Sequence, residues 1–212
     1  MADSQLYSRR LLPKGHGYPL FRPQPSNDLP IEYRRLGASI GDVGVITADG
    51  YFDFIFSICA AADSPINALG VPKGFKQVAL PPGAIFYAKE HHPPGCDISN
   101  TTTKKRRLDL DAAVEDNVFL PVGAGATVQI TASARQFASL VLPKGASRCN
   151  LRSLQQFESY AIENGPEWYS FINGHLKRKV ENRSLYLVTG VDKSSSGAWR
   201  RWTISRGITR YP

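Results

Sequence analysis

The sequence lacks long hydrophobic runs and has few cysteines. No stretch of about 18 consecutive apolar residues is present, so no transmembrane helix is predicted. The three cysteines, Cys59, Cys96 and Cys149, are an odd number without a C-x-x-C pair, which argues against a disulfide framework. The first residues also lack the apolar stretch of a secretory signal. These absences predict an intracellular protein, cytoplasmic or nuclear.

Nucleotide-binding motifs are missing as well. The chain has no G-x-x-x-x-G-K-[ST] sequence and no G-x-G-x-x-G sequence that opens a helix. The glycines at 41–44 and 123–125 are not followed by the lysine and helix that a phosphate loop needs. We therefore expect no nucleotide cofactor, and no other cofactor is indicated.

Positive charge is what the sequence has in excess. Lys and Arg number 26 against 18 Asp and Glu, which gives a net charge of +8 and a pI near 9.5. One basic block lies at 104–107, and the segment 177–210 carries nine Lys and Arg against two acidic residues. Such an imbalance favours an acidic partner: a protein, a nucleic acid or an anionic lipid.

The most apolar stretch, 40–61, predicts a β-hairpin. Residues 42–47 are rich in Val and Ile, and Ala48-Asp49-Gly50 is a turn signal. Residues 51–58 then alternate, with Phe52, Phe54, Phe56 and Ile58 on one face and more polar residues on the other. A period of two with four large apolar side chains predicts a half-buried strand rather than a helix.

The remaining pattern predicts an α+β fold with a mostly antiparallel β-sheet. Prolines recur through residues 1–36, which favours an extended N-terminal arm packed on a single domain at 37–212. One helical hairpin is expected at about 151–172, capped by Asn150 and interrupted at Gly165-Pro166. Short strands are expected at 84–89, 118–122, 126–131, 138–142, 185–191 and 198–205.

Several strings resemble a domain family that is abundant in mushroom-forming basidiomycete fungi. They are LLPKGHGYPLFRPQP, LPIEYRRLGASIGDVGVITADGYFDFIFSIC, INALGVPKGF, ENGPEWYSFING and SLYLVTGVDKSSSGAW, in this order between residues 6 and 199. The resemblance implies a eukaryotic intracellular protein with one fold across the chain, and it carries over no catalytic residue. The segment KKRRLDLDAAVEDN and the basic end after Trp199 depart from the family pattern.

The one local cluster with acid–base side chains is His91-His92-Pro93-Pro94-Gly95-Cys96-Asp97. Neighbouring histidines on an extended backbone point to opposite sides, so the sequence assigns no metal site, although the spacing of His92 and Cys96 suits zinc. The candidate catalytic residues are His91 and His92, each with Asp97 or Asp42 as a remote carboxylate. An ordinary polar loop accounts for the same residues.

Aromatic and cationic residues that suit an anionic ligand form the second candidate site. They are Lys177, Arg178, Lys179, Trp199, Arg200, Arg201 and Trp202, with Lys104, Lys105, Arg106 and Arg107 as a separate strip or an import signal. The leading hypothesis is a non-enzymatic recognition module that binds an acidic partner through this C-terminal face. The alternatives are a hydrolase or nuclease that uses the His91/His92 loop, and a membrane-active β-hairpin protein. Structural use of the same aromatic and basic residues also fits the pattern.

Overall fold

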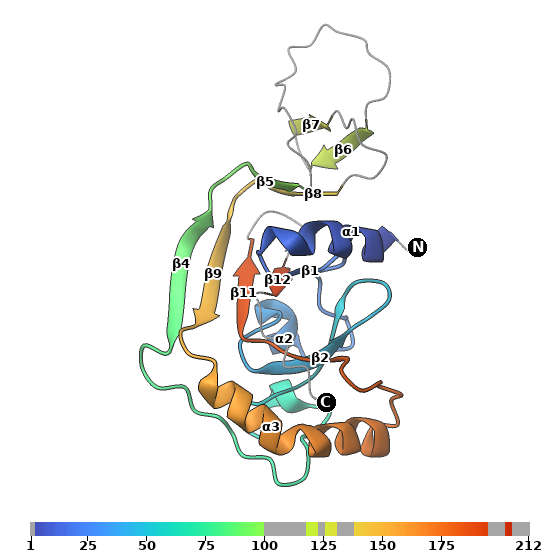
Figure 1. The fold of residues 1–212 in the computed structure, drawn as a ribbon, viewed down its shortest axis with the longest axis vertical. Helices are drawn as coiled ribbons and strands as arrows, with labels where there is room; N and C mark the ends of the chain where they lie inside the picture. The colour runs from blue at the N-terminus through green and yellow to red at the C-terminus, as the bar shows by residue number, and fades with distance from the viewer. Residues whose placement is uncertain (1–2, 100–117, 123–125, 131–137, 195–201, 205–212) are drawn as a thin grey trace, which may run out of the picture.

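The structure, a computed structural model, describes residues 3–99, 118–122, 126–130, 138–194 and 202–204 (Figure 1). Helices and strands mix without a regular alternation, and every strand pairing is antiparallel. This confirms the α+β class with antiparallel sheets. Within the described ranges, none of the helices has both the length and the apolar character needed to cross a bilayer.

The hairpin at the centre of the chain forms as the sequence predicts. Strands β2 (Asp42–Ile46) and β3 (Phe52–Ser57) pair around the turn that contains Gly50, and β10 (Leu185–Leu187) adds a third strand beside β2. The predicted single apolar face is wrong: Phe52 and Phe54 pack in one core cluster, whereas Phe56 and Ile58 pack in another together with Ile55. The reason is a register shift, because Val43 pairs with Phe56 and Gly44 with Phe54, which leaves Ile55 as an extra residue and interrupts the alternation.

The larger sheet has five strands in the order β1-β12-β11-β9-β4. They are β1 (Tyr18–Pro19), β12 (Trp202–Ile204), β11 (Gly190–Lys193), β9 (Ala146–Leu151) and β4 (Ile85–His92). Two further pairs join β5 (Cys96–Ser99) to β8 (Ser139–Leu142) and β6 (Val118–Val122) to β7 (Ala126–Ile130). In Figure 1 the β4–β9 hairpin forms a long arc beside the rest of the fold.

The helices do not all lie where the sequence places them. The N-terminal residues, expected as an extended arm, begin with helix α1 (Asp3–Leu11), followed by the 3-10 turn η1 (Leu12–Lys14) and later by helix α2 (Ile31–Leu36). α1 is possible because the first proline comes only at Pro13, after the helix has ended. A second 3-10 turn, η2, covers Pro65–Asn67.

The predicted break of the helical hairpin is wrong. Helix α3 (Gln155–Tyr169) runs through Pro166 and continues into a π-helical turn, η3 (Ser170–His175). Proline inside a helix costs about 3 kcal/mol, but Trp168, Phe171 and Ile172 are all buried. Burial of such side chains is worth roughly 1.5–3 kcal/mol each, which outweighs the cost of Pro166. The expected cap Asn150 instead lies in β9.

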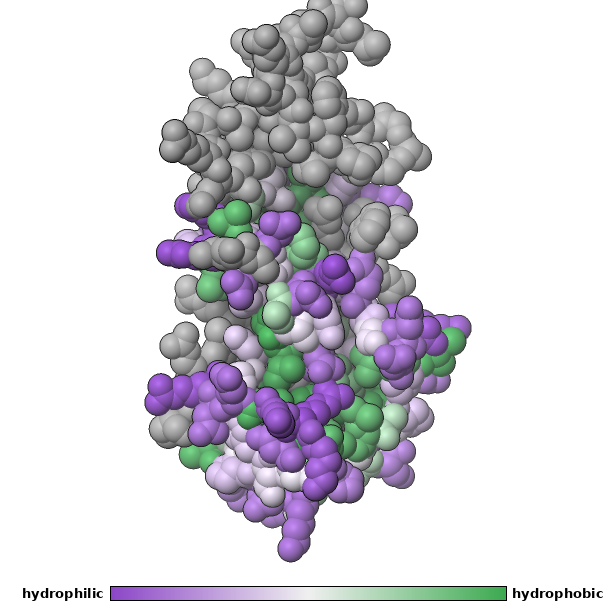
Figure 2. Space-filling view, turned by 90° about the vertical axis from the view of Figure 1, so that its right-hand side faces the viewer, coloured by the Kyte–Doolittle hydropathy of each residue, from purple (hydrophilic) through white to green (hydrophobic). Residues whose placement is uncertain are grey.

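Three apolar clusters hold these elements together. The first joins the β2–β3 hairpin to α3 through Phe56, whose ring meets those of Trp168 and Phe171 edge-on. The second packs α2 and β1 against the hairpin, with the rings of Tyr33 and Phe54 4.0 Å apart. The third places α1 on the β5–β8 pair. On the face shown in Figure 2, hydrophilic residues surround a few smaller apolar patches.

Candidate functional site: a histidine cluster around Asp192

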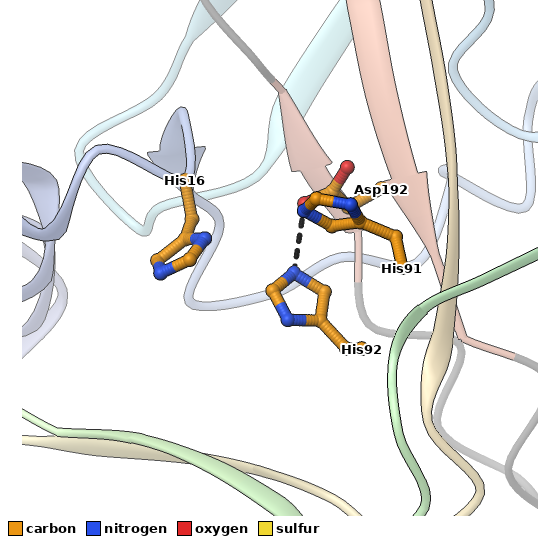
Figure 3. Close-up of side chains that lie close together, drawn as sticks. All are labelled: His16, His91, His92 and Asp192. Atoms are coloured by element: carbon orange, nitrogen blue, oxygen red, sulfur yellow. Dashed lines mark hydrogen bonds and ion pairs between the residues drawn. The ribbon is translucent and has the colours of Figure 1, made fainter. Parts of the chain in front are cut away.

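Three of the four histidines of the chain meet at one place. His16, His91 and His92 lie together with Asp192, and one ligand-type atom from each falls within 4.8 Å of all the others. Figure 3 shows the ring of His16 approaching from one side and those of His91 and His92 from the other, beside the carboxylate. Residues separated by up to 176 positions in sequence therefore build a compact site.

An irregularity in β4 brings two adjacent histidines to the same place. β4 pairs with β9 in regular register up to Ala88 and Arg148, and the pairing resumes only at His92 and Ala146. Four steps along β4 thus match two along β9, so the alternation of side chains is lost over the extra residues. The rings of His91 and His92 lie 4.6 Å apart at 81°. The expectation that neighbouring histidines point apart fails for this reason.

His16 lies in the short turn between η1 and β1. Gly15 and Gly17 on either side of it both have positive φ, 77° and 88°. β1 and β4 are the two edges of the five-stranded sheet. In a flat sheet these edges would stand about 19 Å apart, four strand spacings. His16, in the turn before β1, nevertheless reaches His92, with ring centroids 5.0 Å apart.

Asp192 is the fixed centre of the site. It lies on β11 opposite Arg148 of β9, and it is 2% exposed. Arg148 donates two hydrogen bonds of 2.6 Å, from Nε to Oδ1 and from Nη2 to Oδ2. His92 Nε2 lies 3.2 Å from Oδ2. A bidentate guanidinium fixes the position of the carboxylate.

The electrostatics of the site favour neutral imidazoles. Burial lowers the pKa of His16, and His92 and Arg148 lower it further. Burial also lowers the pKa of His91, with Arg148 as the next cause. Near neutral pH the ring nitrogens of both therefore keep a free lone pair, which is the form that coordinates metals. The Nδ1 atom of His16 is buried without a hydrogen-bond partner among the described residues.

Cys96 lies on the other side of the His92 ring. Its Sγ is 3.9 Å from His92 Nδ1, which is a long contact, whereas Nε2 faces Asp192. Thiol, imidazole and carboxylate thus stand in the order used by cysteine hydrolases. A hollow of about 350 Å³ lies elsewhere, at the start of α3, lined by residues such as Leu80, Ala84 and Phe157. It is at the opposite end of the β4–β9 hairpin from His92.

The two predicted remote carboxylates are engaged elsewhere. Asp97 accepts a short hydrogen bond from the hydroxyl of Ser139, across the β5–β8 pair. Asp42 is fully buried, and it accepts hydrogen bonds from Tyr33 and from the backbone of Ser39. The carboxylate beside the histidines is Asp192, which no motif singles out. The one signal for it in the sequence is its position directly after the apolar run LYLVTGV.

Most of the predicted anionic-ligand face falls outside the described residues. This holds for Lys104, Lys105, Arg106, Arg107, Trp199, Arg200 and Arg201, and Trp202 is described only as part of β12. Lys177 and Lys179 are exposed, whereas Arg178 forms an ion pair of 2.6 Å with Asp53. The hypothesis of an acidic partner at this face therefore stays a prediction.

Comparison with known proteins adds no relative. No protein-family model, curated protein or solved structure matches the chain. Its function is therefore argued from the geometry of the site.

Proposed function

We propose that the protein binds a divalent transition-metal ion of the zinc class through His16, His91, His92 and Asp192. The observation that carries this proposal is the convergence of three histidines and a buried carboxylate within 4.8 Å. Imidazole nitrogen with one carboxylate oxygen is a donor set that suits zinc, copper, nickel and iron, and it does not suit calcium or magnesium.

The distances fit such an ion. Ligand atoms about 2.1 Å from a tetrahedral ion stand about 3.4 Å from one another. His92 Nε2 and Asp192 Oδ2 are 3.2 Å apart, so that edge of a tetrahedron is already formed. The other atoms would close in by small rotations of the His16 and His91 rings, which are only partly buried. The unpartnered Nδ1 of His16 supports this, because a buried nitrogen without a partner is costly.

Metal binding is better supported than the hydrolase alternative. The Cys96–His92 contact is 3.9 Å, and the described hollow lies at the far end of the hairpin. A nucleophile needs a cavity for its substrate beside it. An ion needs donor atoms rather than a substrate cavity, and the four side chains supply such atoms.

Calorimetric titration of the protein with Zn²⁺ at pH 7.5 tests the proposal. We expect one ion per chain, together with a rise in melting temperature, since the ion binds the folded state. His16→Ala removes a ligand, so it should weaken binding by more than the roughly 10–100-fold seen when an outer-shell partner is lost. Unfolding of the metal-free variant is measured beside the wild type to show that it folds.

The matched control is His175→Ala. His175 is the fourth histidine; it is exposed, and its ring stacks on Phe171, 5.5 Å between centroids. This variant should bind Zn²⁺ as tightly as the wild type. Equal affinity in His16→Ala, or the same loss in both variants, would contradict the proposed site.

A further inference from the structure

The charges around the histidine cluster leave a bound cation poorly compensated. Asp192 is the one carboxylate among the charges that act on His16, and both its oxygens are already bonded to Arg148. The other fixed charges there, Arg148 and Lys14, are positive. A divalent ion bound to neutral imidazoles would raise the local excess to three positive charges.

An excess of this size in a partly buried site calls for an anion. Asp192 supplies little further compensation, because its charge is shared with a guanidinium at 2.6 Å. His16 and His91 are half-buried rather than enclosed, which leaves part of each residue accessible to an external ligand. Zinc sites accept such a ligand as the fourth or fifth donor.

Lys14 can select the kind of anion, because its positive charge is among those that act on His16. It ends η1, two residues before His16, and its side chain is exposed. Gly15, with φ of 77°, caps η1 by donating its N–H to the carbonyl of Leu12. This turn fixes the path of the chain from Lys14 to His16. A flexible ammonium two residues along the chain from a metal ligand is suited to hold a phosphate-class oxyanion.

We infer that the metal-loaded site takes a phosphate-class oxyanion as external ligand, held between the ion and Lys14. The inference rests on the proposed metal site. In this inference, part of the protein's net charge of +8 binds an anion at the histidine cluster, away from the C-terminal basic face. Free phosphate and the phosphate group of a larger molecule share this chemistry.

The test uses the full chain loaded with Co²⁺, freed of excess ion by gel filtration. Inorganic phosphate is added, and the width of its ³¹P resonance is followed, since a phosphate on paramagnetic Co²⁺ relaxes fast. We expect saturable broadening with the wild type and none with the metal-free protein. A phosphorylated serine peptide added as competitor distinguishes the two sources: displacement indicates a phosphate carried on a larger molecule, and its absence indicates free phosphate.

Lys14→Ala should weaken phosphate binding roughly fivefold, the upper end for an exposed charge pair. The chain offers a close control in Lys73→Ala. Pro72-Lys73-Gly74 repeats the sequence of Pro13-Lys14-Gly15, and Gly74 has a similar φ of 72°. Lys73 lies in the connection between η2 and β4, and its removal should leave phosphate binding unchanged.

Each outcome bears on one of the two claims. If Co²⁺ is lost on gel filtration, the metal site itself fails. If Co²⁺ stays bound but the phosphate line does not broaden, the external ligand is water or hydroxide and the inference is overturned. Equal weakening by Lys14→Ala and Lys73→Ala would show that only net charge matters, and this too would overturn the role given to Lys14.

Discussion

Two aspartates in this fold are buried to the same extent but have neighbours of different charge. Asp42 is 1% exposed and Asp192 is 2% exposed. Among the described residues, the hydrogen-bond donors to Asp42 are neutral: Tyr33 Oη at 3.0 Å, Ser39 N at 2.7 Å and the side chain of Ser57. Asp192 meets a guanidinium and an imidazole.

The difference separates a structural carboxyl group from one that can bind a ligand. Burial raises the pKa of Asp42 to about 7, and its hydrogen bonds offset that rise only in part. Such a group can lose its charge and stay in place at the start of β2, beside Tyr33 of α2. Asp192 is paired with Arg148 and lies beside the ring of His92. Burial alone therefore does not identify a ligand-binding carboxylate. The charge of the neighbouring groups distinguishes the two aspartates.

The largest effect is expected from breaking the Asp192 pair. Asp192→Asn leaves Arg148, whose side chain is 15% exposed, without its counter-charge. Removing one partner of a buried pair costs about 3–5 kcal/mol. We expect a loss of this size in the free energy of unfolding, measured with urea in the absence of metal.

A double variant provides the control for that loss. Asp192→Asn combined with Arg148→Met removes the orphaned charge, so part of the stability should return. Metal binding should not return, because the carboxylate is still missing. If the double variant is less stable than the single one, Arg148 contributes by its packing and not by its charge.

The second prediction concerns Asp42 and pH. Its pKa is about 7 in the folded protein and 3.8 when unfolded, so between these values the folded state holds a proton that the unfolded state has lost. The contribution of Asp42 to stability is therefore full below pH 3.8 and declines as pH rises through 7. The decline is at most about 4 kcal/mol.

Asp42→Asn removes the titrating group and should flatten this slope. Urea unfolding at several pH values from 4 to 8, compared with the wild type, measures the difference. The variant should gain relative stability toward pH 8. A difference between the two proteins that stays constant with pH would show that Asp42 is ionised in the fold at every pH tested.

Much of the fold could be predicted from local patterns. The β2–β3 hairpin follows from alternating aromatics around Asp49-Gly50, because turn chemistry and burial agree there. The continuity of α3 could not be predicted, since Pro166 favours a break locally while the contacts of Trp168 with Phe56 come from tertiary packing. β9 could not be predicted either, because its residues ASRCNL carry little apolar alternation.

The site could be predicted only in part. His91 and His92 are conspicuous as a pair, and both contribute. The irregularity in β4 that turns them to one side has no local signal, and neither does the approach of His16 to His92. Asp192 and Arg148 are found through their cross-strand register, which no single-sequence pattern specifies. Long-range pairing thus decides which side chains meet at this site.

The smallest effect is expected from Tyr33→Phe, which removes one hydroxyl donor to Asp42 and keeps the ring that packs on Phe54. At pH 5, where Asp42 is protonated, the loss should be about 1 kcal/mol, as for a neutral hydrogen bond. At pH 8 the carboxylate is charged and the loss should rise to about 1.5–3 kcal/mol. In the Asp42→Asn background the pH dependence of the loss should disappear. If the pH dependence persists there, the Tyr33 hydroxyl acts on a titrating group other than Asp42. The description of Asp42 as a buried carboxyl group held by neutral donors would then be incomplete.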